Sequence, residues 1–160
     1  MKQHYIHEHR IYSNHNMFYL YFEFIGYTMS LIETTTNVNL DLSMYPSFVS
    51  ALFVKDDNKW IKIAGYRIGA TIYSYNNTII CEECDEHSFS EWSGLWFNPN
   101  NYMYCIKKNR EQVLELINYY KGLRIIVSSF DRPFILALTF LSRNTSFHQN
   151  VRCWSKIIFN

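Results

Sequence analysis

Hydrophobic and polar positions alternate along much of the first hundred residues, which predicts β-strands. Residues 59–63 show this alternation clearly, with Trp60 and Lys62 on one face. The other strands predicted in this part of the chain are 18–25, 48–55, 69–75 and 78–81, and residues 27–35 either continue the strand 18–25 or return alongside it. Asn76 and Asn77 separate the strands 69–75 and 78–81, and asparagine tolerates the positive φ of a tight hairpin turn. The pattern therefore predicts an antiparallel meander.

The period of the pattern changes near residue 110. Apolar side chains now recur at i, i+3, i+4 and i+7, which is one face of a helix: Val113, Leu116, Ile117 and Tyr120. Asn109 with Gln112 three residues later is typical of a helix N-terminal cap, and Gly122 suits the left-handed residue after the last turn. We therefore expect an amphipathic helix over residues 110–121.

The remaining hydrophobic runs predict further strands, at 102–106, 123–128, 134–141 and 151–159. The expected fold class is α+β, a mostly antiparallel meander sheet with one amphipathic helix near 110–121 packed on it. A chain of 160 residues is one ordinary domain. Residues 1–16 hold four of the six histidines among polar side chains and predict a flexible tail, which leaves 17–160 as the single α+β domain.

Charge is distributed unevenly along the chain. Residues 1–106 carry six basic and eleven acidic side chains, whereas residues 107–160 carry nine basic and three acidic ones. The net charge is only +1, so nucleic acid is a less favoured partner than protein. Aromatic residues make up 18% of the chain, which is rich enough to supply a binding face.

No secretory signal pattern and no uninterrupted apolar run long enough to span a membrane are present, so we expect no membrane partner. Four irregularly spaced cysteines do not resemble a disulfide scaffold. A reducing, cytoplasmic setting is the resulting expectation.

The stretch 78–97 concentrates the unusual chemistry. Cys81, Cys84 and His87 follow a three-residue spacing, and two thiolates with one imidazole can converge on a zinc ion. The site would need a fourth ligand, and the candidates are isolated: Cys105, His148 and Cys153. The alternative is that these cysteines are ordinary small residues at a hairpin end, with no cofactor. A redox role is disfavoured because no predicted helix follows Cys84.

The chain contains no nucleophile elbow, phosphate-binding glycine loop or paired zinc-protease histidines, which argues against an enzyme. Basic residues next to aromatic ones in the C-terminal half allow a nucleic-acid interface. Those residues are Lys107, Lys108, Arg110, Lys121 and Arg124 around the predicted helix, and Arg152, Trp154 and Lys156 on the last predicted strand.

The leading hypothesis is a non-enzymatic protein-binding module of the inhibitor or immunity type. An acidic segment bearing tryptophans would cover a basic surface on a partner protein, because buried tryptophan anchors interfaces and acidic neighbours speed encounter. The predicted binding residues are Glu82, Glu83, Asp85, Glu86, Glu91, Trp92 and Trp96. The alternative is a small enzyme or a metal-dependent nucleic-acid-binding module built on Cys81, Cys84 and His87.

Overall fold

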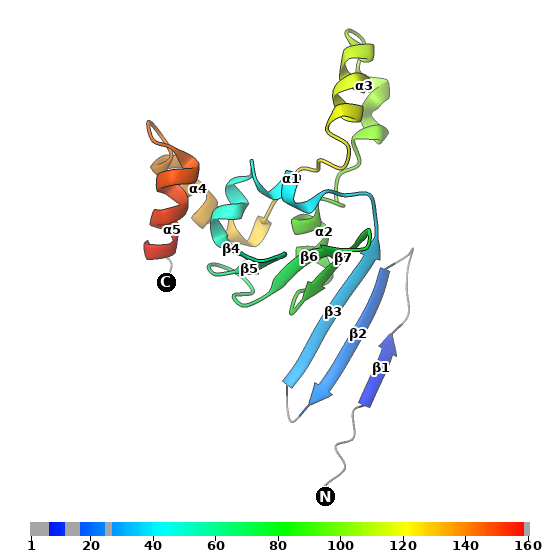
Figure 1. The fold of residues 1–160 in the computed structure, drawn as a ribbon, viewed down its shortest axis with the longest axis vertical. Helices are drawn as coiled ribbons and strands as arrows, with labels where there is room; N and C mark the ends of the chain where they lie inside the picture. The colour runs from blue at the N-terminus through cyan, green and yellow to red at the C-terminus, as the bar shows by residue number, and fades with distance from the viewer. Residues whose placement is uncertain (1–6, 12–16, 25–26, 159–160) are drawn as a thin grey trace, which may run out of the picture.

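The computed structural model describes residues 7–11, 17–24 and 27–158, with side chains from residue 30 onward except that of His148. The strands form one seven-stranded antiparallel sheet in the order β1-β2-β3-β7-β6-β5-β4 (Figure 1). Their bounds are β1 His7–Ile11, β2 Met17–Phe24, β3 Tyr27–Thr35, β4 Phe53–Asp56, β5 Lys59–Lys62, β6 Thr71–Tyr75 and β7 Thr78–Glu82. The predicted α+β class and the antiparallel meander are confirmed.

Two details of the sheet bear on the sequence predictions. Asn76 and Asn77 have φ values of 47° and 61° and form the tight turn between β6 and β7, as predicted. Strand β1 lies within residues 1–16, the predicted tail, and pairs with β2. The rest of that segment lies outside the described residues, so the predicted boundary at residue 17 stays a prediction.

One face of the sheet carries the core. Four register partners run across β5, β6, β7 and β3, and all four are buried: Trp60, Ile72, Cys81 and Ile32. Lys62 shares the buried face with Trp60, as the alternation predicted, and is itself buried. The other face bears Lys59, Thr71 and Glu82, which are only half-buried. The sheet thus separates an apolar layer from a polar one.

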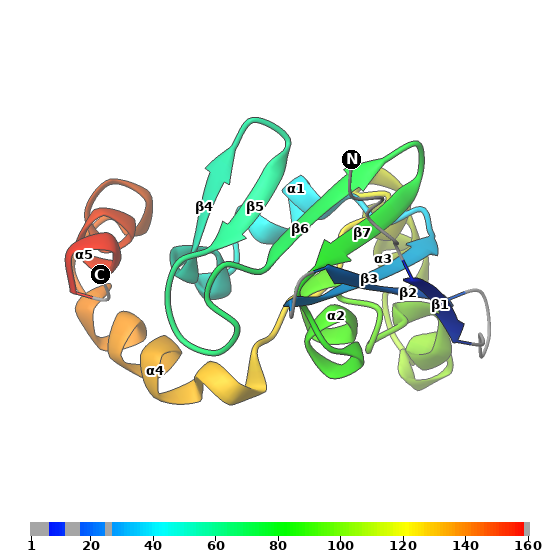
Figure 2. The ribbon, with the colours of Figure 1, turned by 90° about the horizontal axis from the view of Figure 1, so that it is seen from below.

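Helical segments cover the buried face and extend beyond it. The α-helices are α1 Leu40–Met44, α2 Glu86–Ser93, α3 Arg110–Tyr119, α4 Arg132–Leu141 and α5 Arg152–Ile158. Shorter turns are the 3₁₀ segments η1 Phe48–Leu52, η2 Pro99–Cys105 and η3 Ser129–Asp131, and the π-helical turn η4 Phe147–Val151. Helices α4 and α5 form one end of the molecule and α3 the opposite end (Figures 1 and 2).

Several predicted strands are helical instead. The run 134–141 lies within α4, and the run 151–159 contains α5. The segment 102–106 lies mostly in η2, and 123–128 forms no strand. Only the second half of 48–55 is a strand, β4. The run 134–141 is apolar at almost every position, so it fits a buried strand and a helix equally well. Pro133 in the first turn of α4 is typical of a helix start, since its missing N–H costs no bond there.

The predicted helix at 110–121 exists as α3, but its packing was predicted wrongly. No residue of α3 is buried, and the helix stands away from the sheet (Figure 1). Asn109 is the residue before the helix, yet its side chain makes no capping bond. Gly122 has the predicted left-handed backbone, with φ of +87°. The chain therefore does not form one helix packed on the sheet, because α3 stands away from the sheet and other helices cover it.

The different surroundings of α3 and α4 lead to a paired stability prediction. Leu116 of α3 is 56% exposed, whereas Leu138 of α4 is fully buried. Replacing Leu138 with alanine should cost about 2–5 kcal/mol of unfolding free energy, because it leaves a cavity in the core. Leu116→Ala should change it by less than about 0.5 kcal/mol. Urea denaturation measures both, and a large loss for Leu116→Ala would place α3 against the core.

Candidate functional site

The segment 78–97 runs from strand β7 through a tight turn into helix α2. Glu83 has a left-handed backbone with φ of 59°, which turns Cys84 back toward Cys81. Both cysteines are buried in the core and form a disulfide with each other. Cys84 comes two residues before α2, so the expectation that no helix follows it is wrong.

The predicted zinc ligands are not brought together. Cys81 and Cys84 bind each other, while the exposed His87 turns to Ser129, whose Oγ lies 2.9 Å from His87 Nε2. Among the described residues, no group of three His, Cys, Asp or Glu side chains is arranged to hold a metal ion. Cys105 and Cys153 are exposed free thiols at distant places in the chain.

Three of the five predicted acidic binding residues serve the fold itself. Glu82 accepts hydrogen bonds from Lys59, Thr71 and Tyr73 on the polar face of the sheet. Asp85 caps α2 by accepting the Ser88 N–H at 2.9 Å, and Glu91 accepts the Ser129 N–H at 2.7 Å. Of the predicted acidic set, only Glu83 and Glu86 are exposed.

Internal hydrogen bonds lower the pKa of two of these carboxyl groups, Glu82 and Asp85. Burial alone would raise the pKa of Glu82, but the hydrogen bonds from Thr71, Lys59 and Tyr73 outweigh it, and the pKa is lowered. Burial and the Glu82 carboxylate raise the pKa of Tyr73 to about 12. Glu82 is therefore charged at neutral pH and Tyr73 stays a hydrogen-bond donor.

The two predicted tryptophan anchors have different surroundings. Trp92 is 1% exposed, packs edge-on against Phe53 at 5.3 Å between ring centroids, and donates its indole N–H to Ser128. It is a core residue, so its prediction as a docking anchor is wrong. Trp96 is 46% exposed and donates to the Ile125 carbonyl at 2.8 Å. Trp96 alone keeps a ring that a partner can reach.

A buried ion pair lies beneath α2 and was not predicted from the sequence. Lys62 Nζ lies 2.5 Å from Asp131 Oδ2, and both side chains are fully buried. Asp131 also accepts the Ser128 hydroxyl at 2.6 Å and the Tyr66 N–H at 2.6 Å. Burial lowers the pKa of Lys62, and its bond to Asp131 offsets this only in part. The signal in the sequence was the alternation that puts Lys62 on the face of Trp60.

Glycine at position 65 makes the close approach to Asp131 possible. A Cβ atom there would lie 2.0 Å from Asp131 Oδ1, and Gly65 has φ of +82°. A larger residue would push the carboxylate away from the Tyr66 N–H. The pair is out of reach of a substrate and joins β5 to the segment before α4, so we assign it to the fold.

Ser129, His87 and Glu91 resemble a nucleophile, base and acid, but their geometry differs from a catalytic triad. Ser129 Oγ and Glu91 Oε1 both contact His87 Nε2, at 2.9 and 3.2 Å. In a triad the acid binds one ring nitrogen and orients the other toward the nucleophile. Here His87 Nε2 must carry a proton to donate a hydrogen bond to Glu91. The protonated nitrogen cannot then accept a hydrogen bond from the Ser129 hydroxyl. The cluster is better suited to tie α2 to η3.

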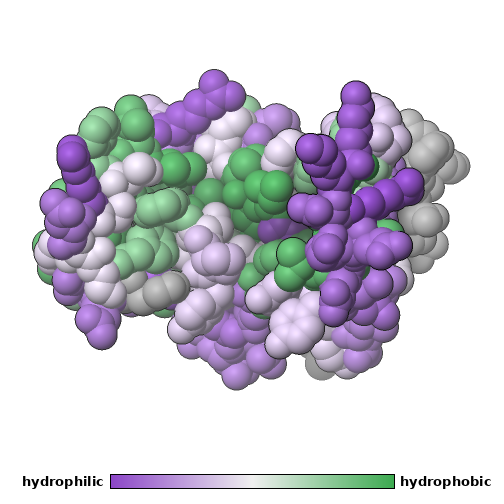
Figure 3. Space-filling view, turned by 90° about the horizontal axis from the view of Figure 1, so that it is seen from above, coloured by the Kyte–Doolittle hydropathy of each residue, from purple (hydrophilic) through white to green (hydrophobic). Residues whose placement is uncertain are grey.

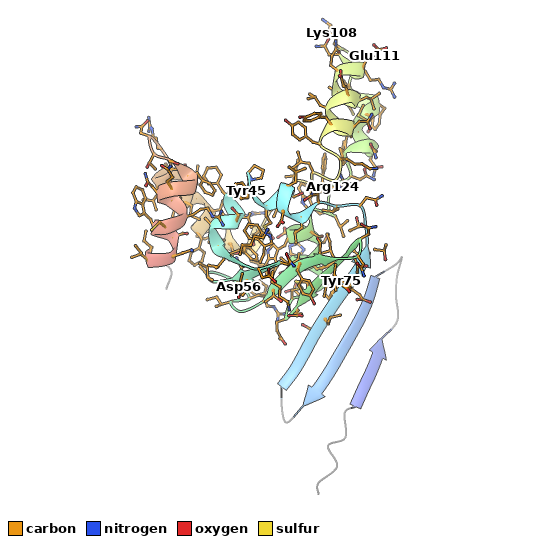
Figure 4. The ribbon with its side chains drawn as sticks, viewed as in Figure 1. Tyr45, Asp56, Tyr75, Lys108, Glu111 and Arg124 are labelled. Atoms are coloured by element: carbon orange, nitrogen blue, oxygen red, sulfur yellow. A yellow bond between two sulfur atoms is a disulfide. The ribbon has the colours of Figure 1, made fainter. Side chains whose placement is uncertain are left out.

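A different surface stands out at the α3 end of the molecule. Segment η2 and helix α3 form an arm, with Lys108 and Glu111 at its free end and Arg124 where the chain returns to the body (Figure 4). Aromatic rings lie along the part of the chain that leads into the arm. The ring centroids of Trp96 and Phe97 are 5.4 Å apart, and Phe97 stacks on Tyr102 with 5.0 Å between centroids.

The returning side of the arm encloses a groove of about 740 Å³, which we call the α3 groove. Apolar side chains dominate its lining: Phe97, Val113, Leu116, Ile117, Leu123 and Ile125. Lys121 and Arg124 supply its charges, and none of the carboxylates in the described part of the chain lines it. Val113, Leu116 and Ile117 are the face predicted to pack on the sheet. Their period was recognised, but the sequence did not reveal that the face lines a groove.

A second pocket, of about 520 Å³, lies at the polar end of the sheet. Residues 36–41 line it together with the turn residues Asn58 and Asn77 and with Lys121. The carboxylate among its lining residues is that of Asp41. It already accepts hydrogen bonds from Lys55 Nζ at 2.6 Å and from the Trp60 indole N–H at 2.8 Å. We therefore regard the α3 groove as the stronger candidate site.

Comparisons with protein-family models, with curated proteins and with solved structures find no match to this chain. Within residues 7–11, 17–24 and 27–158, no helix has both the length and the apolar character needed to cross a bilayer.

Proposed function

We propose that this chain is a non-enzymatic protein-binding module whose docking site is the α3 groove. The observation that carries the proposal is that α3 has no buried residue, although its apolar face is regular and lines a groove. An apolar segment of a partner protein, most simply an amphipathic helix, would fill the groove and cover Leu116 and Ile117.

The energetics of a short helix support this assignment. Isolated helices under about 12–15 residues are marginal in water, and most helical stability comes from packing an apolar face. Helix α3 has 10 residues and packs none of them fully. A partner helix in the groove would supply that packing, so binding and ordering of α3 would be coupled.

The charge of the site indicates the charge of the partner. Lys121 and Arg124 are the charged residues that line the groove, and at the tip of the arm Lys107, Lys108 and Arg110 outnumber Glu111. A partner segment with acidic flanks complements these cations and is steered toward them. The basic partner expected for the acidic segment has less support, because Glu82, Asp85 and Glu91 are engaged internally and Trp92 is buried. An inhibitor or immunity role stays a prediction.

Selection from a displayed library of helical peptides tests the proposal. We expect the enriched peptides to carry apolar residues at i, i+3 and i+4 with Asp or Glu beside them. They should bind Leu116→Asp at least about tenfold more weakly than wild type, since a buried unpaired charge is costly. Leu136→Asp is the matched control, because Leu136 of α4 is 58% exposed, nearly the same as Leu116.

Two results would contradict the proposal. Enriched peptides that bind the Leu116→Asp and Leu136→Asp variants with equal affinity would show that the groove is not the site. The groove would also be excluded as the site if no enriched peptide lost affinity in the Leu116→Asp variant while that variant melted like wild type. Displacement of selected peptides by a single-stranded oligonucleotide would instead favour a nucleic-acid interface on the arm.

A further inference from the structure

Helix α4, at the opposite end of the molecule from the arm, is apolar on its outward face. Only Leu138 of its ten residues is buried, yet Arg132 and Thr139 are its only polar residues. Leu136 and Phe140 lie one turn apart and are 58% and 69% exposed. A helix that is hydrophobic on all sides normally lies inside a protein or against lipid. The outward face of α4 therefore requires a cover.

Helix α5 shows the same feature. Ser155 is buried and donates its hydroxyl to the Ala51 carbonyl of η1 at 2.8 Å, which fixes the inward face of the helix. Trp154, Ile157 and Ile158 remain exposed, Ile157 to 73%. Figure 3 shows hydrophobic surface gathered over the α4–α5 side, whereas the α3 side is mostly hydrophilic.

All charged side chains of α4, α5 and the segment that joins them are basic. Between residues 132 and 158 the chain carries four of them, and it carries no Asp or Glu: Arg132, Arg143, Arg152 and Lys156. Arg132, Arg143 and Lys156 are exposed. Both helices pack against η1, which has no charged residue either. We call this end, residues 132–158, the α4–α5 face.

The charges limit what can cover this face. A second copy docked symmetrically would bring like charges together across the contact, which is unfavourable. An acidic protein would need a concave surface matching two helices at the outer end of the molecule (Figure 2). A bilayer surface needs no such match, because fluid lipid adapts to protruding apolar side chains while anionic headgroups meet the cations.

We propose that the α4–α5 face docks on an anionic membrane surface. Leu136, Phe140 and Ile157 enter the boundary between headgroups and acyl chains, and the exposed Arg132, Arg143 and Lys156 lie among the lipid phosphates. The helices lie on the bilayer and do not cross it, which agrees with the absence of a spanning helix among the described residues. The expectation of no membrane partner rested on spanning segments, which do not bear on surface docking.

The helical conformation of α5 also revises one sequence prediction. Arg152, Trp154 and Lys156 were expected on one strand face, where they could have tracked a phosphate backbone. In helix α5, Arg152 and Lys156 are one turn apart, whereas Trp154 lies two residues from each and so on another side of the helix. Arg152 lies over the buried Trp60 ring, so Lys156 is the exposed cation of α5. Separation of the Trp154 ring from Lys156 suits an interface in which the ring is immersed and the ammonium group stays at the phosphates.

Co-sedimentation with vesicles tests the proposal on the full chain. We expect binding to mixed phosphatidylserine–phosphatidylcholine vesicles and little binding to pure phosphatidylcholine vesicles. Arg132→Gln and Arg143→Gln should each weaken binding about fivefold, since one basic residue near an anionic surface contributes roughly that factor. The double variant Leu136→Ser/Phe140→Ser should weaken it at least about tenfold.

Fluorescence quenching by brominated acyl chains gives an independent readout. Trp60 and Trp92 are buried and Trp96 lies at the arm, so quenching should come mainly from Trp154 and be lost in Trp154→Phe. Leu116→Asp, in the α3 groove, is the control and should bind vesicles like wild type. Leu116→Asp alters the α3 groove and leaves the α4–α5 face unchanged, so it separates the two proposals.

Three outcomes would overturn the proposal. They are equal binding to neutral and anionic vesicles, no binding to either, and undiminished binding by the Leu136→Ser/Phe140→Ser variant. The second outcome would leave an acidic protein as the cover of this face. Thermal unfolding of each variant near the wild-type temperature ensures that the comparison concerns binding and not folding.

Discussion

Lys62→Met should destabilise the protein by about 3–5 kcal/mol, because it leaves the Asp131 carboxylate buried without its counter-ion. The two side chains are fully buried and lie 2.5 Å apart. Only the Ser128 hydroxyl and the Tyr66 N–H would still donate to the carboxylate. A domain of this size is stable by about 5–15 kcal/mol, so the change would remove a large share of the total. Urea denaturation followed by circular dichroism measures the loss.

The control is an ion pair in solvent. Lys55 Nζ lies 2.6 Å from Asp41 Oδ2, but the side chains are 37% and 58% exposed, so Lys55→Met should cost at most about 1 kcal/mol. Removing both buried partners, in Lys62→Met/Asp131→Leu, should recover part of the lost stability, because no charge is then buried alone. A loss below about 1 kcal/mol for Lys62→Met would mean that water reaches the pair.

Trp92→Ala should cost about 3–5 kcal/mol, the range expected when a buried large aromatic side chain is truncated. Its ring packs edge-on against Phe53, and the Lys62 ammonium group lies 5.4 Å from the centroid of the Trp92 ring. The change also removes the indole donor to Ser128, a residue bonded to Asp131. Differential scanning calorimetry should show a melting temperature far below that of wild type.

Trp96→Ala is the comparison within the same segment. Its ring is nearly half exposed, and its hydrogen bond to the Ile125 carbonyl lies at the surface. We therefore expect Trp96→Ala to lower the free energy of unfolding by about 1–2 kcal/mol. Collisional quenching of fluorescence should be stronger in wild type than in Trp96→Phe, since Trp96 is more exposed than Trp92. Equal stability losses for Trp92→Ala and Trp96→Ala would contradict the assignment of Trp92 to the core and Trp96 to the surface.

The segment 78–97 shows why residue type did not identify the site. Its acidic residues and tryptophans were predicted to form one docking surface, because they are close in the sequence. In the fold, strand β7 directs Cys81 inward and Glu82 to the opposite face, and α2 buries Trp92. Neighbours in sequence thus point to different sides, and the carboxylates meet donors from strands and loops elsewhere in the chain.

Local patterns alone determined the meander, the Asn76-Asn77 turn, the shared face of Trp60 and Lys62, and the existence of helix α3. These depend on side-chain period and on backbone preferences within a few residues, which act before any distant contact forms. The tertiary structure alone decided that residues 134–141 and 152–158 are helical, since an apolar run fits either period. It also decided that Lys62 finds Asp131, 69 positions away, and that the apolar face of α3 packs on no core. Burial and ion pairing depend on which distant segments meet, and no local period encodes that.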